Sequence, residues 1–274
     1  MLGGSRADAR DVDRSARPRA VRLLIAFALV VGGLAAGVSL YVGAIQAGLI
    51  RNPLGPVVRG DLAGARSERP GLRVLFVGNS LTYYNDMPGL VQKLAAGDPG
   101  ARPLFAVYYT APGWSLRSAS RDGGLADLLH EVDWDVLVLQ EHSTRAAAPE
   151  ESLRRDTVPF ARDLQDRATA RGARTVVFMN WFAREPEATD LGIELAASVA
   201  PAALAWDEAL RGRPGLDLLG SDGAHPNLAG SYLIACVFYA TLTGRDPTAS
   251  SFTAGLTRSD ARYLQRAAAN VARR

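Results

Sequence analysis

From residue 71 onward, short apolar runs alternate with segments whose apolar residues recur every three or four positions. The runs have the length of β-strands and are rich in β-branched or aromatic residues, which is typical of strands buried in a parallel sheet. The predicted strands are Leu72–Val77, Leu104–Tyr109, Asp135–Leu139, Thr175–Met179 and, interrupted by Pro201, Val199–Leu204. The predicted helices are Met87–Ala96, Gly124–Val132, Glu150–Arg171, Glu187–Ser198, Asn227–Leu242 and Ser259–Arg273. This alternation predicts a three-layer α/β/α sandwich around a parallel, flavodoxin-like sheet of about five strands.

A run of 28 residues without any charge, Leu23–Ile50, precedes this region. As a helix it would be about 42 Å long, which is enough to cross about 30 Å of hydrocarbon. Six arginines lie in residues 1–22, and the positive-inside rule places such a segment in the cytoplasm. We therefore expect a cytoplasmic basic tail over 1–22 and a signal anchor over 23–50. The anchor would form one transmembrane helix and hold the rest of the chain outside the cell membrane.

A cleavable signal peptide is the alternative, with small residues near Ala44 and Ala47 as the cleavage site and a secreted domain as the product. The apolar part of such peptides spans only about 7–15 residues, so the longer run here favours the anchor. Residues 51–70 are rich in Pro, Gly and Arg and show no sustained periodicity. We expect them to form a linker before a single domain over 71–274.

The net charge of +3 resides in the tail, because residues 1–22 hold six Arg and three Asp. The rest of the chain holds 25 basic and 25 acidic residues, so it offers no broad phosphate-binding face and no nucleic-acid partner is expected. The single Cys236 excludes an internal disulfide. The three histidines are too scattered for a helix-borne pair of metal ligands. We expect neither a metal nor an organic cofactor.

Two polar segments stand where the loops of an α/β sheet carry chemistry. Gly78-Asn79-Ser80-Leu81 follows the first predicted strand, and Asp222 precedes His225 by three residues in a Gly/Pro-rich turn before a late helix. An Asp that holds one imidazole nitrogen lets the other accept a proton from a serine hydroxyl. The alternative is that both segments only cap helices, a role for which Ser, Asn and Asp are favoured.

Together the two segments resemble the first and last blocks of the SGNH, or GDSL-type, hydrolase superfamily of esterases and lipases. Val77-Gly78-Asn79-Ser80-Leu81 matches its Gly-Asp-Ser or Gly-Asn-Ser block, and the pair Asp222 and His225 matches its Asp-x-x-His block. The resemblance covers nearly all of residues 71–274. It implies that Ser80, Asp222 and His225 form a catalytic triad.

The resemblance also implies an oxyanion hole, whose N–H groups stabilise charge on the substrate carbonyl oxygen. The expected donors are the backbone of Ser80 and of Gly113, which follows the second predicted strand; a Pro-Gly turn without chemistry is the alternative. The family's Gly-x-Asn-Asp block is replaced by Leu-Gln-Glu-His-Ser, similar to a bacterial subgroup with a Leu-Gln-x-x-Ser block. We expect the Gln140 amide as third donor. His142 or Ser143 is the alternative donor, and Gln140 would then be a buried structural amide.

Further polar and aromatic residues at the strand ends are candidates for a substrate pocket, although aromatic residues there often only cap the core. These candidates are Asn79, Tyr83, Trp114, His142, Asn180 and Trp181. The sequence thus predicts a serine hydrolase that cleaves an acyl or acetyl ester of a small molecule or glycan. An acyltransferase acting on cell-surface glycans would use the same triad, and a non-catalytic anchored module that binds glycan or protein is a further alternative. Fold and triad do not select the substrate.

Overall fold

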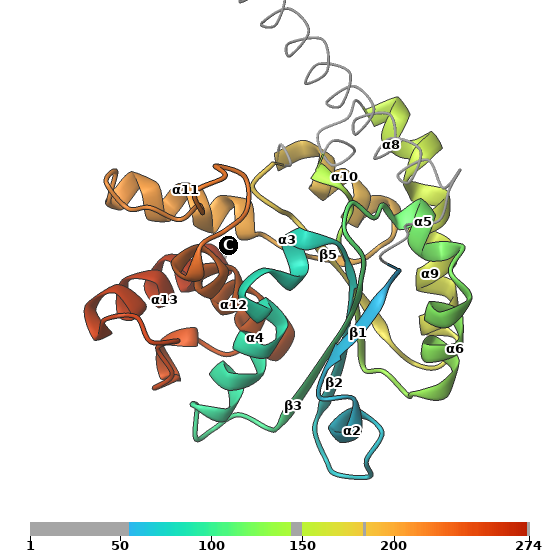
Figure 1. Ribbon diagram of the computed structural model, residues 1–274, viewed down its shortest axis with the longest axis horizontal. Coiled ribbons are helices and arrows are strands. Elements are labelled where there is room, and N and C mark those ends of the chain that lie inside the picture. Colours follow the sequence, from blue (N-terminus) through green and yellow to red (C-terminus); the bar gives the residue numbers. More distant parts are fainter. Residues whose placement is uncertain (1–54, 144–149, 183–184, 273–274) are drawn as a thin grey trace, which may run out of the picture. The chain divides into compact units, whose positions relative to one another are not determined.

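The computed structural model describes residues 55–143, 150–182 and 185–272. Its centre is a six-stranded sheet in the order β1-β3-β2-β4-β5-β6 (Figure 1). The strands are β1 (Val57–Gly60), β2 (Leu72–Gly78), β3 (Leu104–Thr110), β4 (Val136–Leu139), β5 (Arg174–Phe178) and β6 (Ser198–Ala200). Strands β2 to β6 are parallel, and counted from β2 their order is that of a flavodoxin-like sheet. The predicted α/β class and its four uninterrupted strands are therefore confirmed.

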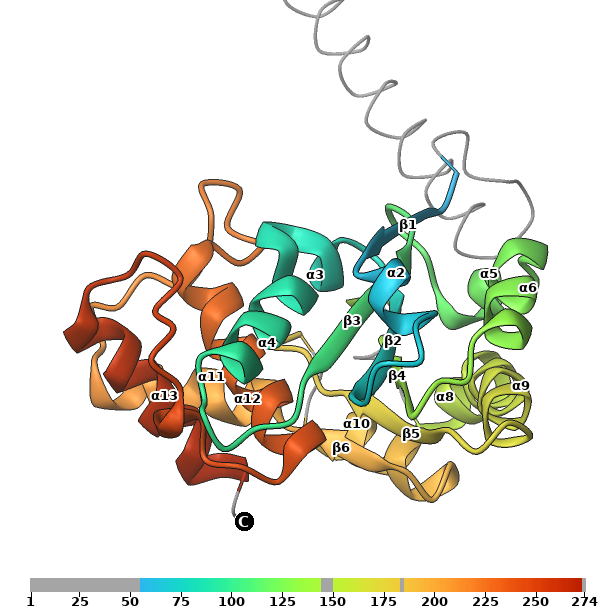
Figure 2. The same cartoon turned by 90° about the horizontal axis from the view of Figure 1, so that it is seen from below.

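Helices cover both faces of the sheet and make three layers (Figures 1 and 2). One layer contains α4 (Met87–Ala96), α11 (Ala202–Gly212), α12 (Leu228–Thr243) and α13 (Arg258–Ala272), and the other contains α5 (Leu116–Ser120), α6 (Gly123–Glu131), α8 (Glu150–Asp156), α9 (Val158–Thr169) and α10 (Glu185–Glu194). Val74 and Phe76 of β2 pack in the first core, and Leu75 and Val77 pack in the second. Because successive strand residues face opposite sides, each continuous apolar run fills both cores.

Two predicted elements differ from the observed ones at a proline. The strand expected over Val199–Leu204 is the three-residue β6, and α11 begins at Ala202, directly after Pro201. The helix expected over 150–171 is two helices, and Pro159 lies in the first turn of the second, α9. Proline lacks a backbone N–H and is tolerated at the start of a helix rather than inside it. The chain therefore starts a new helix at each of these points.

The expected linker over 51–70 is wrong from Val57 onward. There β1 pairs antiparallel with β3, which places Val57 opposite Thr110, so the sheet is neither wholly parallel nor limited to five strands. All four residues of β1 are exposed, so no buried run marks the strand in the sequence. Gly60 has a φ of 99°, and a β-carbon there would lie 2.2 Å from the carbonyl oxygen of Ala106. Only glycine allows this close approach of the two backbones.

The remaining helices are short and connect these elements. They are α2 (Leu62–Ala65), α3 (Ser80–Tyr83) and the 3₁₀ helices η1 (Tyr84–Asp86) and η2 (Pro247–Ala249). The predicted basic tail over 1–22 and the predicted anchor over 23–50 lie outside the described residues. Within the part of the chain that is described, no helix is both long and apolar enough to cross a bilayer.

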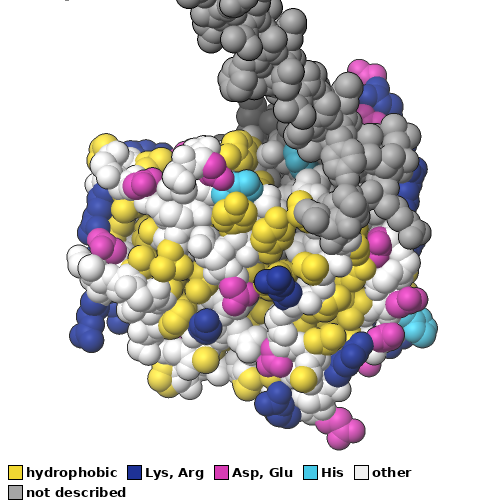
Figure 3. Space-filling model, in the orientation of Figure 1, with side chains coloured by type: hydrophobic (Ala, Val, Ile, Leu, Met, Phe, Trp, Pro, Cys, Tyr) yellow, Lys and Arg dark blue, Asp and Glu magenta, His cyan; other side chains and the backbone are white. Residues whose placement is uncertain are grey.

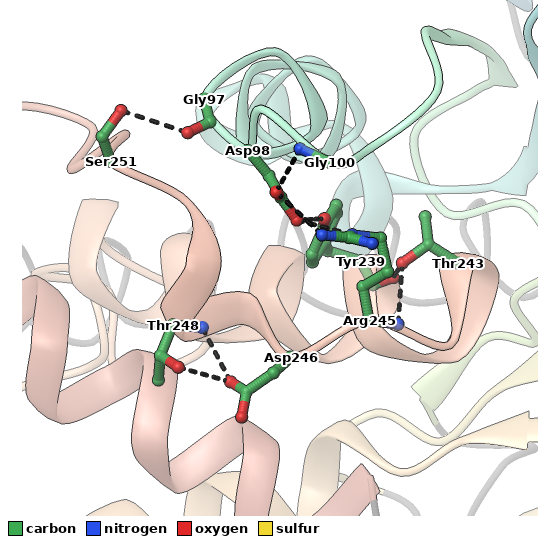
Figure 4. A network of polar contacts seen from close by, with 9 residues as sticks. All are labelled: Gly97, Asp98, Gly100, Tyr239, Thr243, Arg245, Asp246, Thr248 and Ser251. Atoms are coloured by element: carbon green, nitrogen blue, oxygen red, sulfur yellow. Dashed lines mark hydrogen bonds and ion pairs between the residues drawn. The ribbon is translucent and has the colours of Figure 1, made fainter.

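A buried carboxylate joins the ends of α4 and α12 (Figure 4). Asp98 accepts hydrogen bonds from Tyr239 Oη (2.5 Å), from Arg245 Nε (2.6 Å) and Nη2 (3.0 Å), and from Gly100 N (2.9 Å). The Asp98 side chain is 2% exposed, and that of Arg245 is 39% exposed. The bonds from Arg245, with those from Tyr239 and Gly100, hold the pKa of Asp98 well below its usual range despite its burial.

We expect Asp98→Asn to lower the free energy of unfolding by about 2 kcal/mol at pH 7, since hydrogen bonds to a charged group contribute about 1.5–3 kcal/mol. Arg245 is partly exposed and can turn to solvent, so the loss stays below the roughly 3–5 kcal/mol of a pair broken in the interior. Because the pKa of Asp98 is lower folded than unfolded, its stabilisation is complete above about pH 4 and is lost as the pH falls further. Urea unfolding of both proteins at pH 7 and near pH 3 measures this. If the two proteins differed in free energy of unfolding by the same amount at both pH values, the carboxylate charge would not be the source of the stabilisation.

Candidate active site

The first site residue stands where β2 ends, at the point where the strand order of the sheet reverses. Ser80 is the first residue of α3, and Asn79 caps that helix with its Oδ1, which accepts from Leu81 N at 3.1 Å. The Asn79 amide Nδ2 donates to the carbonyl oxygen of Trp114 at 2.8 Å. Asn79 is thus buried and fixes the turn, and this leaves Ser80 half-exposed at the carboxyl edge of the sheet. In open α/β sheets this edge is where ligands bind.

The structure brings the three residues of the predicted triad together. His225 Nε2 lies 2.8 Å from Ser80 Oγ, and His225 Nδ1 lies 2.7 Å from Asp222 Oδ2. The loop that carries Asp222 and His225 closes on itself, because Gly220 N donates to the His225 carbonyl oxygen at 2.7 Å. Asn227 then caps α12, with Oδ1 accepting from Gly230 N at 3.0 Å. Helix capping, the alternative for this segment, is therefore done by Asn227, while the Asp222 carboxylate faces the imidazole.

Local hydrogen bonds keep Asp222 ionised. Its Oδ1 accepts from the backbone N–H groups of Ala224 (3.0 Å) and His225 (2.9 Å). The bond from Ala224, followed by those from the side chain and backbone of His225, lowers the pKa of Asp222 to about 2. An ionised carboxylate can only accept, so the Nδ1 of a neutral His225 carries the proton. Its Nε2 is then the acceptor for the Ser80 hydroxyl.

Two residues of η1 hold the His225 loop, and the sequence did not single them out. The Tyr84 ring lies parallel to the His225 ring, with centroids 4.0 Å apart and an interplanar angle of 7°. Asn85 Nδ2 donates to the Pro226 carbonyl oxygen and to Ser231 Oγ, both at 2.9 Å. The only sequence signal for them is that Tyr84 neighbours Tyr83, the predicted pocket residue after the Ser80 motif.

The two backbone N–H groups expected to form the oxyanion hole belong to the two loops around the Ser80 turn. Gly113 lies in the turn after β3 with a φ of 68°, a conformation that favours glycine. This turn is tied to the Ser80 loop, because Ala111 N donates to the Gly78 carbonyl oxygen at 3.4 Å. Neither Ser80 N nor Gly113 N donates a hydrogen bond to any residue that the structure describes. Both residues are half-exposed.

The structure corrects the role expected for Gln140. Its Oε1 accepts from Asn79 N (2.9 Å) and from Thr82 Oγ1 (3.0 Å), and its Nε2 donates to the Glu141 carbonyl oxygen at 2.6 Å. The residue is completely buried, so its amide N–H is directed into the protein rather than toward a substrate. Gln140 is the structural amide that was the alternative. It fixes the backbone directly before Ser80.

The other predicted pocket residues divide between the core and the loops. Trp114 and Asn180 are buried, and Asn180 Oδ1 accepts from Phe182 N at 2.9 Å. Trp181 supports the triad loop, because its Nε1 donates to the Ala224 carbonyl oxygen at 3.3 Å and its ring stacks on another tryptophan. His142 is half-buried, and its backbone N donates to the neighbouring Glu141 carboxylate. Of the six candidates, Tyr83 lines a cavity, which is described below.

Among the described residues, no group of three or more His, Cys, Asp or Glu side chains is placed to hold a metal ion. Cys236 is fully buried in α12, and burial raises the pKa of its thiol far above the usual range. A protonated thiol that is buried in the core is not a nucleophile.

No family model and no curated protein matches the sequence. Among solved structures, the chain is similar to a DUF4886 family protein from Bacteroides uniformis, with 15% identity, 74% of this chain and 95% of that chain covered, and a TM-score of 0.60. It also matches an acetylxylan esterase from Geobacillus stearothermophilus (14% identity, 68% and 97% covered, TM-score 0.44) and the esterase EstA from Pseudoalteromonas sp. (17% identity, 61% and 94% covered, TM-score 0.44). The α/β sandwich that the SGNH resemblance implies is the observed fold.

Proposed function

We propose that the protein is an SGNH-type serine hydrolase that cleaves carboxylic esters through an acyl-enzyme intermediate. The observation that carries this proposal is the hydrogen-bonded chain from Ser80 Oγ to His225 Nε2 (2.8 Å) and from His225 Nδ1 to Asp222 Oδ2 (2.7 Å). A serine hydroxyl bonded to an imidazole that is itself held by an ionised carboxylate is the arrangement that activates serine as a nucleophile. A serine that only capped a helix would not need this series of hydrogen bonds.

In the first half of the reaction, Ser80 Oγ attacks the ester carbonyl carbon and its proton passes to His225 Nε2. Asp222 stabilises the imidazolium that forms, and the parallel Tyr84 ring keeps the imidazole in its plane. The backbone N–H groups of Ser80 and Gly113 stabilise the negative charge on the former carbonyl oxygen. His225 then gives the proton to the alcohol oxygen, the carbon–oxygen bond breaks, and the acyl group remains on Ser80.

In the second half, a water molecule attacks the acyl carbon while His225 Nε2 takes its proton. The same two N–H groups stabilise the second tetrahedral intermediate. The bond to Ser80 Oγ breaks, the proton returns from His225 to that oxygen, and the carboxylic acid leaves. Ser80 and His225 are both half-exposed, so water has access to the acyl-enzyme.

A fluorophosphonate probe tests this function on the full chain, because such probes react with activated serines. We expect one covalent label on the peptide that contains Ser80, together with hydrolysis of 4-nitrophenyl esters by the same preparation. A binding module without catalysis would take no label. Labelling at a different serine, or undiminished labelling after His225→Ala, would overturn the proposal.

A further inference from the structure

A cavity of about 260 Å³ adjoins two loops of the active site, and no triad residue lines it. It is lined by Gly55, Val57, Arg59, Tyr83, Tyr108 and Pro112. Two of these residues belong to the loops of the active site: Tyr83 is three positions after Ser80 in the same helix, and Pro112 directly precedes Gly113. Residues three apart on a helix share a face, so the Ser80 and Tyr83 side chains point to the same side. The cavity therefore adjoins the helix that carries the attacking oxygen.

The opposite wall of the cavity is the edge strand β1. Val57 and Arg59 alternate with Val58 along this strand, so the first two face the cavity and Val58 faces away. On the face seen in Figure 3, hydrophobic side chains gather over β1 and α3 with charged side chains between them. Apolar walls interrupted by few polar groups are typical of small-molecule sites.

Both tyrosines of the cavity are neutral at physiological pH. Burial, followed by the charge of Asp86, raises the pKa of Tyr108, and burial raises the pKa of Tyr83. The Tyr83 ring stacks on the Tyr84 ring, with centroids 5.9 Å apart and an angle of 23°. Since Tyr84 in turn stacks on His225, one series of rings connects the cavity wall with the catalytic imidazole.

The position of the cavity in the sheet indicates which half of an ester it receives. The leaving alcohol must lie next to His225, because this residue protonates it. The His225 loop reaches the end of β5, where Trp181 donates to the Ala224 carbonyl oxygen. The cavity lies at β1 and β3, on the other side of β2 and of Ser80. The acyl group is then the half that extends into the cavity.

We infer that this cavity, closed on one side by β1, is the acyl subsite of the hydrolase and takes an apolar acyl group of about the size of one ring. The inference rests on the proposed function and names its substrate class. A cavity of about 150 Å³ holds benzene, so 260 Å³ has room for a benzoyl group or a chain of about six to eight carbons. An acetyl group leaves it largely empty, and a long lipid chain exceeds it.

The test uses the full chain and 4-nitrophenyl esters of acetate, hexanoate, benzoate and dodecanoate. We expect kcat/KM to be higher for hexanoate and benzoate than for acetate or dodecanoate. Val57→Trp fills the cavity and should lower the hexanoate-to-acetate ratio of kcat/KM by at least about 10-fold, since one methylene in an apolar pocket already changes kcat/KM 10-fold or more. Val58→Trp is the matched control: Val57 is 39% exposed and Val58 is 40% exposed, but Val58 faces away from the cavity. This variant should keep the wild-type ratio.

The possible failures are distinguishable. In one outcome, Ser80 is labelled and the esters are hydrolysed, but Val57→Trp and Val58→Trp change the hexanoate-to-acetate ratio of kcat/KM equally or not at all. The acyl subsite is then wrong, while the proposed hydrolase function is supported. A higher kcat/KM of the wild type for acetate than for hexanoate would likewise show that the acyl subsite is wrong, without contradicting the hydrolase function. If no ester is hydrolysed and Ser80 takes no label, both proposals fall. Thermal unfolding of the two tryptophan variants shows that they are folded, as the exposure of both positions leads us to expect.

Discussion

Ser80→Ala is expected to lower kcat for a 4-nitrophenyl ester by about 10⁶-fold while the fold stays intact. The substitution removes the attacking oxygen, so His225 and Asp222 can activate only water, which is not held at the required position. The rate that remains comes from the N–H groups of Ser80 and Gly113 and from substrate binding, roughly 10³–10⁴ above the uncatalysed reaction. Steady-state kinetics of the purified chain, corrected for contaminating esterases by the fluorophosphonate probe, measures the loss.

Ser221→Ala is the matched control for this experiment. Ser221 is an exposed serine directly before Asp222, so it shares the neighbourhood of the triad but not the contact with His225. We expect it to keep the wild-type rate and to take the label at Ser80. If Ser80→Ala retained a substantial part of the activity, the nucleophile would be another residue and the mechanism above would be wrong.

The fold could be predicted wherever burial leaves a mark on the sequence. Strands such as β3 and β4 are buried on both faces of the sheet, so nearly all their residues are apolar and form continuous runs. β1 leaves no such mark, because its four residues are exposed and its place is fixed by backbone pairing with β3. α11 was missed for a different reason. Its alanine-rich start at Ala202 follows Pro201 and continues the apolar run of β6, so periodicity alone did not separate strand from helix.

The site shows the same division between local and long-range information. Ser80 and the pair Asp222 and His225 carry local motifs, and the sequence predicted that they meet. The role of Gln140 depends on which way one amide points, and this is decided by the Asn79 N–H group 61 residues away in the chain. The stacking of Tyr84 on His225 depends on a contact between distant loops. No spacing rule in a single sequence reports either contact.

Asp222→Asn is expected to lower kcat by about 10⁴-fold near neutral pH, which is less than the loss on removing Ser80. The asparagine Oδ1 can still accept from the backbone N–H groups of Ala224 and His225, so the loop keeps its shape. The new NH₂ group, however, donates toward His225 Nδ1 and favours the tautomer with the proton on Nε2. That nitrogen then cannot take the proton of Ser80, and the imidazolium loses the charge that stabilises it.

Asp217→Asn separates this effect from the simple removal of a negative charge near the site. Asp217 is exposed in the same segment and, like Asp222, accepts a backbone N–H two residues ahead, from Leu219 at 3.1 Å. It makes no contact with the imidazole that would set a tautomer, so its variant should keep nearly the full rate. Because the pKa of Asp222 is about 2, the carboxylate is ionised from pH 4 upward, and the 10⁴-fold gap should persist over the whole range in which the wild type is active. The test is to measure kcat against pH for the wild type, Asp222→Asn and Asp217→Asn. If the difference in kcat between the wild type and Asp222→Asn disappeared between pH 5 and 8, the carboxylate would not be the group that orients His225.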